Sequence, residues 1–208
     1  AVATAVNARM QNAGQSCIAA KRFLVHEKIV DEFVAKFKVA IQNLKTGNPL
    51  DKETQIGSLA RVDLAEELEA QVQKSIQMGA DLIVGGTRKE AFYEPTILAN
   101  VTTEMPVFNE ETFGPVASII TFKTLEEAIE LSNQSEFGLG VSIFTQDIDF
   151  IKTKISAFNE GAVFINEMVK SDPRLPFGGI KKSGYGRELA EDGIKEFVNV
   201  KTVVINIL

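Results

Sequence analysis

The chain has 208 residues, of which 45% are hydrophobic and 24% charged, as in an ordinary globular protein with a full core. Its net charge of −6, with no stripe of Lys or Arg to offset it, argues against a nucleic-acid partner. No apolar run approaches the ~20 residues of a membrane span, so we expect no membrane partner. The single cysteine, Cys17, excludes an internal disulfide and fits a reducing compartment, so we expect a cytoplasmic protein.

The amino-terminal stretch, residues 1–13, is made largely of small residues and predicts a helix. Gly14 predicts a bend after it, and the β-prone run at residues 22–26 predicts a strand. The chain opens inside this apparent helix and has no initiator methionine. We therefore expect the sequence to be a piece of a longer protein.

Two long helices are expected next, because apolar residues recur at helical spacing. The first covers residues 29–44 and should stop at Gly47 and Pro49. The second covers residues 64–76, and Gly79 is placed to cap its carboxyl end.

The middle of the chain is harder to assign. Residues 82–84 read as a short buried strand before a pair of glycines. Residues 87–115 contain three prolines and mixed signals, so we expect a loop that wanders over the surface.

The second half of the chain alternates strands and helices. Thr124 and Glu127 form a capping box for one helix, and Asp147 caps another that runs to Phe158. Strands are expected at 116–122, 141–144 and 162–165. Strands that are apolar on both faces indicate a mostly parallel sheet with helices on both sides. The predicted fold class is therefore α/β, a three-layer sandwich with a Rossmann-like arrangement, and residues 1–208 form one domain.

The last residues, about 200–208, are nearly all β-branched or aliphatic. An edge strand this apolar is an aggregation hazard unless it pairs with another strand. We expect it to pair either with the sheet of another subunit or within its own subunit.

The cysteine motif is the run Asn12-Ala-Gly-Gln-Ser-Cys17, followed by Lys21-Arg-Phe23. A junction of helix, glycine, cysteine and strand can expose a thiol at a bend, where free backbone N–H groups can cradle an oxyanion. The alternative is an inert thiol, because a lone free cysteine is commonly a small buried hydrophobe. That alternative describes a scaffold or oligomerisation domain with a structural cysteine.

This motif resembles the active-site cysteine motif of the aldehyde dehydrogenase superfamily. Four further segments resemble that superfamily in the same order, and they are Gly47-Asn-Pro-Leu-Asp51 with Ile56-Gly57, Glu111-Thr-Phe-Gly-Pro-Val116, Phe164-Ile-Asn166, and Pro176-Phe-Gly-Gly179 running on to Ser183-Gly-Tyr-Gly-Arg-Glu188. Residues 170–188 are most similar to bacterial succinate-semialdehyde dehydrogenases. The likeness covers nearly the whole chain.

The resemblance implies that Cys17 is the nucleophile in NAD(P)+-dependent aldehyde oxidation, through a thiohemiacetal and a thioester. It implies that Glu111 binds the nicotinamide ribose, because a carboxylate accepts two hydroxyl hydrogen bonds, and that Phe113 contacts the nicotinamide end. No G-x-G-x-x-G pattern occurs, so NAD or NADP should be bound mainly by a cofactor-binding domain outside this chain. The catalytic glutamate and the oxyanion-binding asparagine of the family are also expected outside it.

Substrate choice is expected to lie in the stretch that ends at Phe177, which resembles an aromatic residue lining the substrate tunnel. Ser171 stands where relatives acting on uncharged aldehydes often carry a large aromatic, and it leaves room for a distal carboxylate. Arg174 is a nearby cation that could bind that carboxylate or be a surface arginine. Some relatives have an arginine where this chain has Gln11, which departs from a carboxylate clamp. The expected substrate is succinate semialdehyde, with glutarate semialdehyde or another small aldehyde as the alternative.

The resemblance also implies a homodimer or tetramer formed through the carboxyl-terminal strand. Ala19 stands where some relatives have a second cysteine, so a disulfide switch within the domain is excluded. His26, the only histidine, has no metal-ligand neighbour in sequence, and we expect no metal site.

Overall fold

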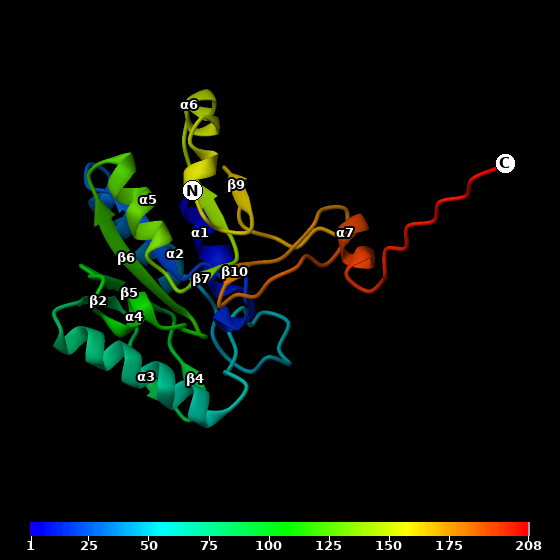
Figure 1. The fold of residues 1–208 in the computed structure, drawn as a ribbon. Coiled ribbons are helices and arrows are strands. Elements are labelled where there is room, and N and C mark those ends of the chain that lie inside the picture. The colour runs from blue at the N-terminus through cyan, green and yellow to red at the C-terminus, as the bar shows by residue number, and fades with distance from the viewer. Residues whose placement is uncertain (208) are drawn as a thin grey trace.

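The computed structural model describes residues 1–207 and centres on a four-stranded sheet in the order β1-β6-β5-β2 (Figure 1). Its strands are β1 (Arg22–His26), β6 (Val116–Phe122), β5 (Thr96–Ala99) and β2 (Asp81–Val84). The first three are parallel, with Arg22 opposite Ser118 in the register, and β2 runs antiparallel at the edge beside β5. The sheet is therefore mostly parallel, as the sequence predicted.

One face of the sheet packs on α2 (Val30–Gln42), which in turn contacts α1 (Val2–Met10). The rings of Phe23 on β1 and Phe37 on α2 lie 5.3 Å apart, and Phe37 is fully buried. The amphipathic pattern of residues 29–44 thus forms the expected helix, with its apolar side on the sheet.

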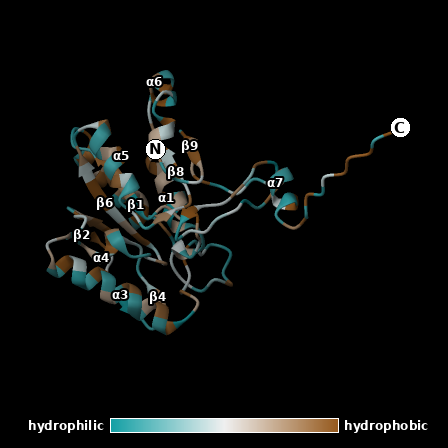
Figure 2. Ribbon diagram, viewed as in Figure 1, coloured by the Kyte–Doolittle hydropathy of each residue, from teal (hydrophilic) through white to brown (hydrophobic). Residues whose placement is uncertain are grey.

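The opposite face is covered by α4 (Pro106–Asn109) and, beyond it, α3 (Val62–Gln77). The Ser118 hydroxyl on β6 donates to the Val107 carbonyl oxygen at 3.3 Å, and the Val107 N–H donates to the Ser75 hydroxyl of α3 at 3.3 Å. Figure 2 shows hydrophobic residues along the strands and hydrophilic ones on the outer side of α3. Helices on both faces make the predicted three-layer α/β sandwich.

The remaining elements lie around this core. Strands β8 (Val141–Ile143) and β9 (Val163–Ile165) form a separate parallel pair and do not extend the main sheet. Two small antiparallel pairs are β3 (Arg88–Lys89) with β4 (Phe92–Tyr93), and β7 (Phe137–Gly138) with β10 (Ile180–Lys181). The other helical segments are η1 (Gln11–Gly14), α5 (Leu125–Asn133), α6 (Ile148–Lys152), η2 (Ile155–Ala157) and α7 (Ala190–Lys195).

The region of residues 87–115 corrects the expectation of a surface loop. It contains β3, β4, β5 and α4, and Ile97, Leu98 and Phe108 are fully buried. The prolines that suggested a loop stand where elements begin, with Pro106 in the first turn of α4. Pro95 and Pro115 come directly before β5 and β6, where a missing N–H costs no ladder bond.

Three further expectations are revised. Residues 82–84 do form a strand, but β2 pairs on one side only and Leu82 is 44% exposed, so this strand is not buried. The predicted helix after Asp147 is interrupted, since α6 ends at Lys152 and a separate 3₁₀ turn follows. The Thr153 hydroxyl donates to the Phe150 carbonyl oxygen at 2.7 Å, a local bond that competes with continuing the helix. The amino-terminal helix ends at Met10 rather than at residue 13.

The carboxyl-terminal segment leaves the body of the molecule beyond α7 (Figure 1). Residues 200–207 form no strand, and the side chains of Val200, Val204 and Ile207 are exposed. Pairing within its own subunit is therefore not seen for this part of the predicted strand, and Leu208 lies outside the described residues. Within residues 1–207, none of the helices combines the length and apolar character needed to cross a bilayer.

The predicted Thr124 cap of α5 forms, while the Glu127 carboxylate bonds to the residue before Thr124, and the cap gives a stability test. The Glu127 N–H donates to the Thr124 hydroxyl at 3.2 Å, and the Lys123 N–H donates to the Glu127 carboxylate at 2.7 Å. We expect Thr124→Ala to lower the free energy of unfolding by about 1 kcal/mol, because the Glu127 N–H in the first turn of α5 loses its side-chain acceptor. Urea unfolding of the chain measures this, with the exposed Thr202→Ala as control. Equal effects of the two variants would contradict the assignment.

Candidate active site

Cys17 lies on a loop between α1 and β1, and its side chain is exposed. The chain reverses there through a turn in which the Ala19 N–H donates to the Ser16 carbonyl oxygen at 2.9 Å. No hydrogen bond within residues 1–207 uses the backbone N–H of Cys17. The structure therefore shows the exposed thiol expected of a nucleophile and contradicts the alternative of a buried cysteine.

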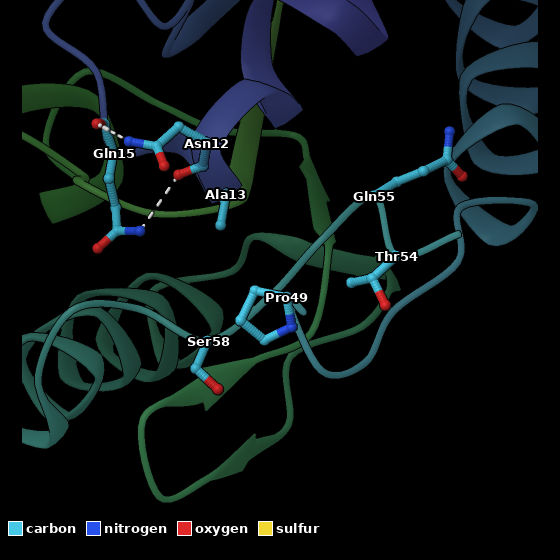
Figure 3. Close-up of a pocket in the computed structure, with 8 residues that line it drawn as sticks. Asn12, Ala13, Gln15, Pro49, Thr54, Gln55 and Ser58 are labelled. Carbon is cyan, nitrogen blue, oxygen red and sulfur yellow. Dashed lines mark hydrogen bonds between the residues drawn. The ribbon is translucent and has the colours of Figure 1, made fainter. Parts of the chain in front are cut away.

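The bend before Cys17 is made by three consecutive residues in the left-handed region of backbone space. Asn12, Ala13 and Gly14 have φ values of 50°, 52° and 74°. This is why the helix predicted to reach residue 13 stops at Met10. The Asn12 amide donates to the Gln15 carbonyl oxygen at 2.8 Å, and the Gln15 amide donates to the Asn12 carbonyl oxygen at 3.2 Å (Figure 3). Local side-chain bonds of this kind support asparagine in the left-handed conformation.

A pocket of about 190 Å³ lies beside this bend. It is formed by the bend and by the segment that carries the second motif, whose Pro49 and Ser58 lie across from Asn12 and Gln15 in Figure 3. The Gln15 side-chain oxygen also accepts from the Ala60 N–H at 2.8 Å, which ties the bend to the start of α3. The pocket's lining carries no charged group within the described residues, so it offers no electrostatic site for an anionic ligand.

Arg9, on the last turn of α1, is only 1% exposed and binds on both sides of Cys17. Its guanidinium donates to the Gly14 carbonyl oxygen at 2.6 Å, to the Ala20 carbonyl oxygen at 3.2 Å and to the Thr112 carbonyl oxygen at 3.3 Å. Burial lowers the pKa of Arg9 to about 10, and the Glu111 carboxylate acts in the opposite direction. Arg9 therefore remains a cation at neutral pH.

Lys21 makes a second connection between the same two segments. Its ammonium group donates to the Glu110 carbonyl oxygen and lies 5.7 Å from the centre of the Phe137 ring. Burial lowers the pKa of Lys21 to about 8, the neighbouring arginines Arg22 and Arg9 add to this, and Glu111 opposes it. The loop of Cys17 and the segment at Glu110–Thr112 are thus joined by two cations from the cysteine side.

Glu111 and Phe113, the residues predicted to contact the cofactor, lie on that adjoining segment. Glu111 is exposed, and Phe113 is 39% exposed although the residues on either side of it are buried. The Glu111 carbonyl oxygen accepts from the Gln71 amide of α3 at 3.2 Å, which anchors the backbone and leaves the carboxylate free of side-chain hydrogen bonds within residues 1–207. The structure brings this predicted pair next to the cysteine loop.

The residues predicted to select the substrate lie in a different segment, residues 169–189. Ser171 is exposed, and Phe177 is partly buried in an antiparallel bridge with Glu188. The Arg174 guanidinium donates to both carboxylate oxygens of Asp172, at 2.9 and 2.6 Å, and holds the pKa of that carboxyl far below its usual range. Arg174 is therefore exposed and already has a carboxylate partner in this structure.

This segment is connected to the cysteine side at two places. The Asn7 amide of α1 lies 3.2 Å from the Met168 sulfur, and β10 pairs with β7, the strand that carries Phe137 beside Lys21. No direct hydrogen bond or ion pair within residues 1–207 links Cys17 with Ser171, Arg174 or Phe177. These three residues stay predictions for the substrate site.

The remaining candidate, His26, makes contacts that support the local structure. Its ring lies 5.3 Å from that of Phe122 on the neighbouring strand, edge to face, and its Nδ1 accepts from the Lys28 N–H at 3.1 Å. No cluster of three or more His, Cys, Asp or Glu side chains suited to a metal occurs in the described part of the chain.

Sequence reasoning missed Arg9 and the role of Lys21. The available signal was a charged residue on the buried side of a small-residue helix, since Ala5, Ala8 and Met10 of α1 are buried with it. An arginine at such a position needs partners, because an unpaired buried charge is costly.

Comparison with known proteins agrees with this reading of the motifs. The aldehyde dehydrogenase family matches residues 1–203. The chain is 48% identical over 206 residues to the NAD(P)+ succinate semialdehyde dehydrogenase Sad of Escherichia coli K12, covering 98% of this chain and 45% of that protein. It is 47% identical over 208 residues to the NADP+ succinate-semialdehyde dehydrogenase of Mycobacterium leprae, covering 99% of this chain and 46% of that protein.

A solved structure gives the same result in three dimensions. The glyceraldehyde-3-phosphate dehydrogenase GapN of Methanocaldococcus jannaschii, complexed with NADP, superimposes with a TM-score of 0.94 at 39% identity, covering 99% of this chain and 45% of that one. The chain therefore belongs to the aldehyde dehydrogenase family. It spans about half the length of the curated relatives it matches.

Proposed function

We propose that the full-length protein is an NAD(P)+-dependent aldehyde dehydrogenase that oxidises succinate semialdehyde to succinate, with residues 1–208 as its cysteine-bearing catalytic domain. The observation that carries the proposal is the exposed Cys17 thiol on a loop tied by Arg9 and Lys21 to the segment of Glu111. A nucleophile and a carboxylate suited to a ribose diol are thereby held on adjoining segments.

Cys17 would act as the nucleophile. Its thiolate forms a bond to the aldehyde carbon, and its own unengaged backbone N–H is free to donate to the resulting oxyanion. Loss of a hydride from that carbon converts the thiohemiacetal to a thioester on Cys17, and water then releases the carboxylic acid and the thiol. The group that activates this water, and the second oxyanion donor, are expected outside this chain.

The residues present fit the nicotinamide end of the cofactor. A bound NAD(P)+ supplies the hydride acceptor. Glu111 offers a carboxylate with no side-chain partner within residues 1–207, which suits two ribose hydroxyls, and Phe113 exposes an aromatic ring two residues away. The name of the E. coli relative includes both cofactors and that of the M. leprae relative NADP+ alone, so the proposal covers either cofactor.

Succinate semialdehyde is proposed as the substrate on two grounds. Both curated relatives carry that substrate in their names. Ser171 is exposed and small, and it leaves space and a hydroxyl donor for a distal carboxylate. The side-chain amide nitrogen of Gln11, at the position where an arginine would complete a carboxylate clamp, is buried without a hydrogen-bond partner in the described residues. The Arg174 guanidinium is paired with Asp172, so any contribution of Arg174 to binding the substrate carboxylate would be made from within that ion pair.

The substrate assignment is tested by comparing kcat/KM of the full-length protein for succinate semialdehyde, glutarate semialdehyde and propanal. We expect a preference of at least about tenfold for succinate semialdehyde over propanal, which corresponds to about 1.4 kcal/mol of transition-state binding. Ser171→Phe should reduce that preference, because the ring fills the space for the carboxylate, while Ser156→Ala on η2 serves as control. An unchanged preference in Ser171→Phe would refute the assignment, and equal values for all three aldehydes would leave only the general activity.

The partners and location complete the proposal. We propose that residues 200–208 pair with another subunit in a dimer or tetramer, supported by the exposed apolar side chains of this segment. The cofactor-binding domain is the other expected partner of the chain. A cytoplasmic location is supported by the single cysteine, which leaves no internal disulfide to form.

A further inference from the structure

The Arg9 guanidinium is buried without an ion-pair partner among the described residues, which is energetically costly. A guanidinium that is 1% exposed has lost nearly all contact with water, and no carboxylate within residues 1–207 forms an ion pair with it. Its Nε also lacks a hydrogen-bond partner in the described residues. Burying a charged group costs free energy unless hydrogen bonds replace the water that it loses. Its presence therefore points to a role in fixing a particular arrangement.

The three bonds of Arg9 all go to backbone carbonyls of two loops. Two of the acceptors, the carbonyls of Gly14 and Ala20, stand at either side of Cys17 in the chain, and the third belongs to Thr112. The helix backbone supports the same loop, since the Ala8 carbonyl oxygen accepts from the Ala20 N–H at 3.0 Å. Arg9 thus holds both ends of the cysteine loop and reaches across to the neighbour of Glu111.

We propose that Arg9 is a positioning residue that fixes the Cys17 loop against the Glu111–Phe113 segment. The thiol and the ribose-binding carboxylate are then held in a constant position relative to one bound cofactor. This inference rests on the proposed function for its catalytic consequence. Five donors in a rigid planar fork suit three carbonyls that point from different directions, and a lysine cannot reproduce that geometry. Arg9 itself touches neither the aldehyde nor the reacting atoms.

Arg22 provides a matched control. It is a partly buried arginine whose guanidinium donates to two carbonyl oxygens, those of Leu131 and Ser132, at 2.8 and 2.9 Å. Those acceptors belong to the end of α5 and not to the cysteine loop or the Glu111 segment, although the Arg22 guanidinium also lies 4.9 Å from the centre of the Phe108 ring on α4. Arg22→Met therefore removes a partly buried arginine and its carbonyl bonds, and it leaves in place the bonds by which Arg9 and Lys21 join the two loops.

The test compares Arg9→Met, Arg9→Lys and Arg22→Met in the full-length protein by two readouts. Amide hydrogen exchange should become at least about tenfold faster in both peptides 14–21 and 110–114 of Arg9→Met, and in neither peptide of Arg22→Met. With saturating aldehyde, Arg9→Met should raise KM for the cofactor and lower kcat, for a combined loss of about 100-fold in kcat/KM. Arg9→Lys should recover part of both effects. If Arg9→Met does not fold, Arg9→Lys against Arg22→Lys carries the same comparison.

Two results would overturn the proposal. One is an exchange pattern in which Arg9 and Arg22 variants match, or in which only one of the two peptides loosens. The other is a kinetic loss in kcat alone, with the cofactor KM unchanged, as general destabilisation would give. If the full-length protein oxidised none of the three aldehydes, the proposed function would be refuted instead. The hydrogen-exchange result would still decide whether Arg9 joins the two loops.

Discussion

Replacing Cys17 by serine should lower kcat/KM of the full-length enzyme for its aldehyde by at least about 10⁴-fold, as expected for loss of a covalent nucleophile. A serine hydroxyl is a far weaker nucleophile at neutral pH, and no group in the described residues is placed to deprotonate it. Because the Cys17 side chain is exposed, the free energy of unfolding should change by no more than about 0.5 kcal/mol.

Two controls sharpen this prediction. Ser16→Ala alters the adjacent residue, whose contribution to the turn is its backbone carbonyl, so its activity should stay within about threefold of wild type. Cofactor binding by Cys17→Ser, followed by fluorescence titration, should be retained because the proposed cofactor contacts Glu111 and Phe113 are unchanged. Appreciable turnover by Cys17→Ser would show that the reaction does not proceed through this thiol.

The second large effect is expected at Gly14, where the cysteine loop lies against Gly114, the residue that follows Phe113. A Cβ on Gly14 would lie 2.1 Å from the Gly114 carbonyl oxygen and 2.6 Å from the Arg9 guanidinium. The backbone φ of +74° also disfavours any side chain. We expect Gly14→Ala to lower the free energy of unfolding by about 3 kcal/mol, since one loop has to move away from the other.

Gly79→Ala separates the two causes of that loss. Gly79 caps α3 with a φ of +107°, but no atom lies within 4 Å of a Cβ built there, so only the conformational cost of about 1 kcal/mol applies. Urea unfolding measures the loss of stability in both variants. The activity of Gly14→Ala should also fall, because the cysteine loop is displaced relative to the Glu111 segment. If Gly79→Ala proved as destabilising as Gly14→Ala, the close contact at Gly14 would not be what fixes the two loops.

Local signals in the sequence predicted the regular elements well. The caps at Thr124 and Asp147 set the starts of α5 and α6, and Gly79 ends α3 as expected. These predictions succeeded because each depends on a hydrogen bond or backbone angle within a few residues. The prolines of the 87–115 region misled because proline both breaks elements and begins them, and only tertiary context decides between the two.

The candidate site was predictable only in part. Cys17, Glu111 and Phe113 were predicted through resemblance, and the structure places their loops side by side. The connection made by Arg9 and Lys21 was not predicted, because it depends on carbonyls about ninety to one hundred residues away in the chain, which no local pattern reveals. The proposed pairing of the carboxyl-terminal segment with another subunit has no counterpart among the described residues, where this segment forms no strand.

The most direct test of the account is to alkylate the full-length enzyme with iodoacetamide while following both aldehyde oxidation and the peptide that contains Cys17 by mass spectrometry. The account predicts that activity falls in proportion to the modification of Cys17. It also predicts that succinate semialdehyde slows both changes. Activity that persists after Cys17 is fully alkylated would contradict the central claim that this thiol carries the reaction.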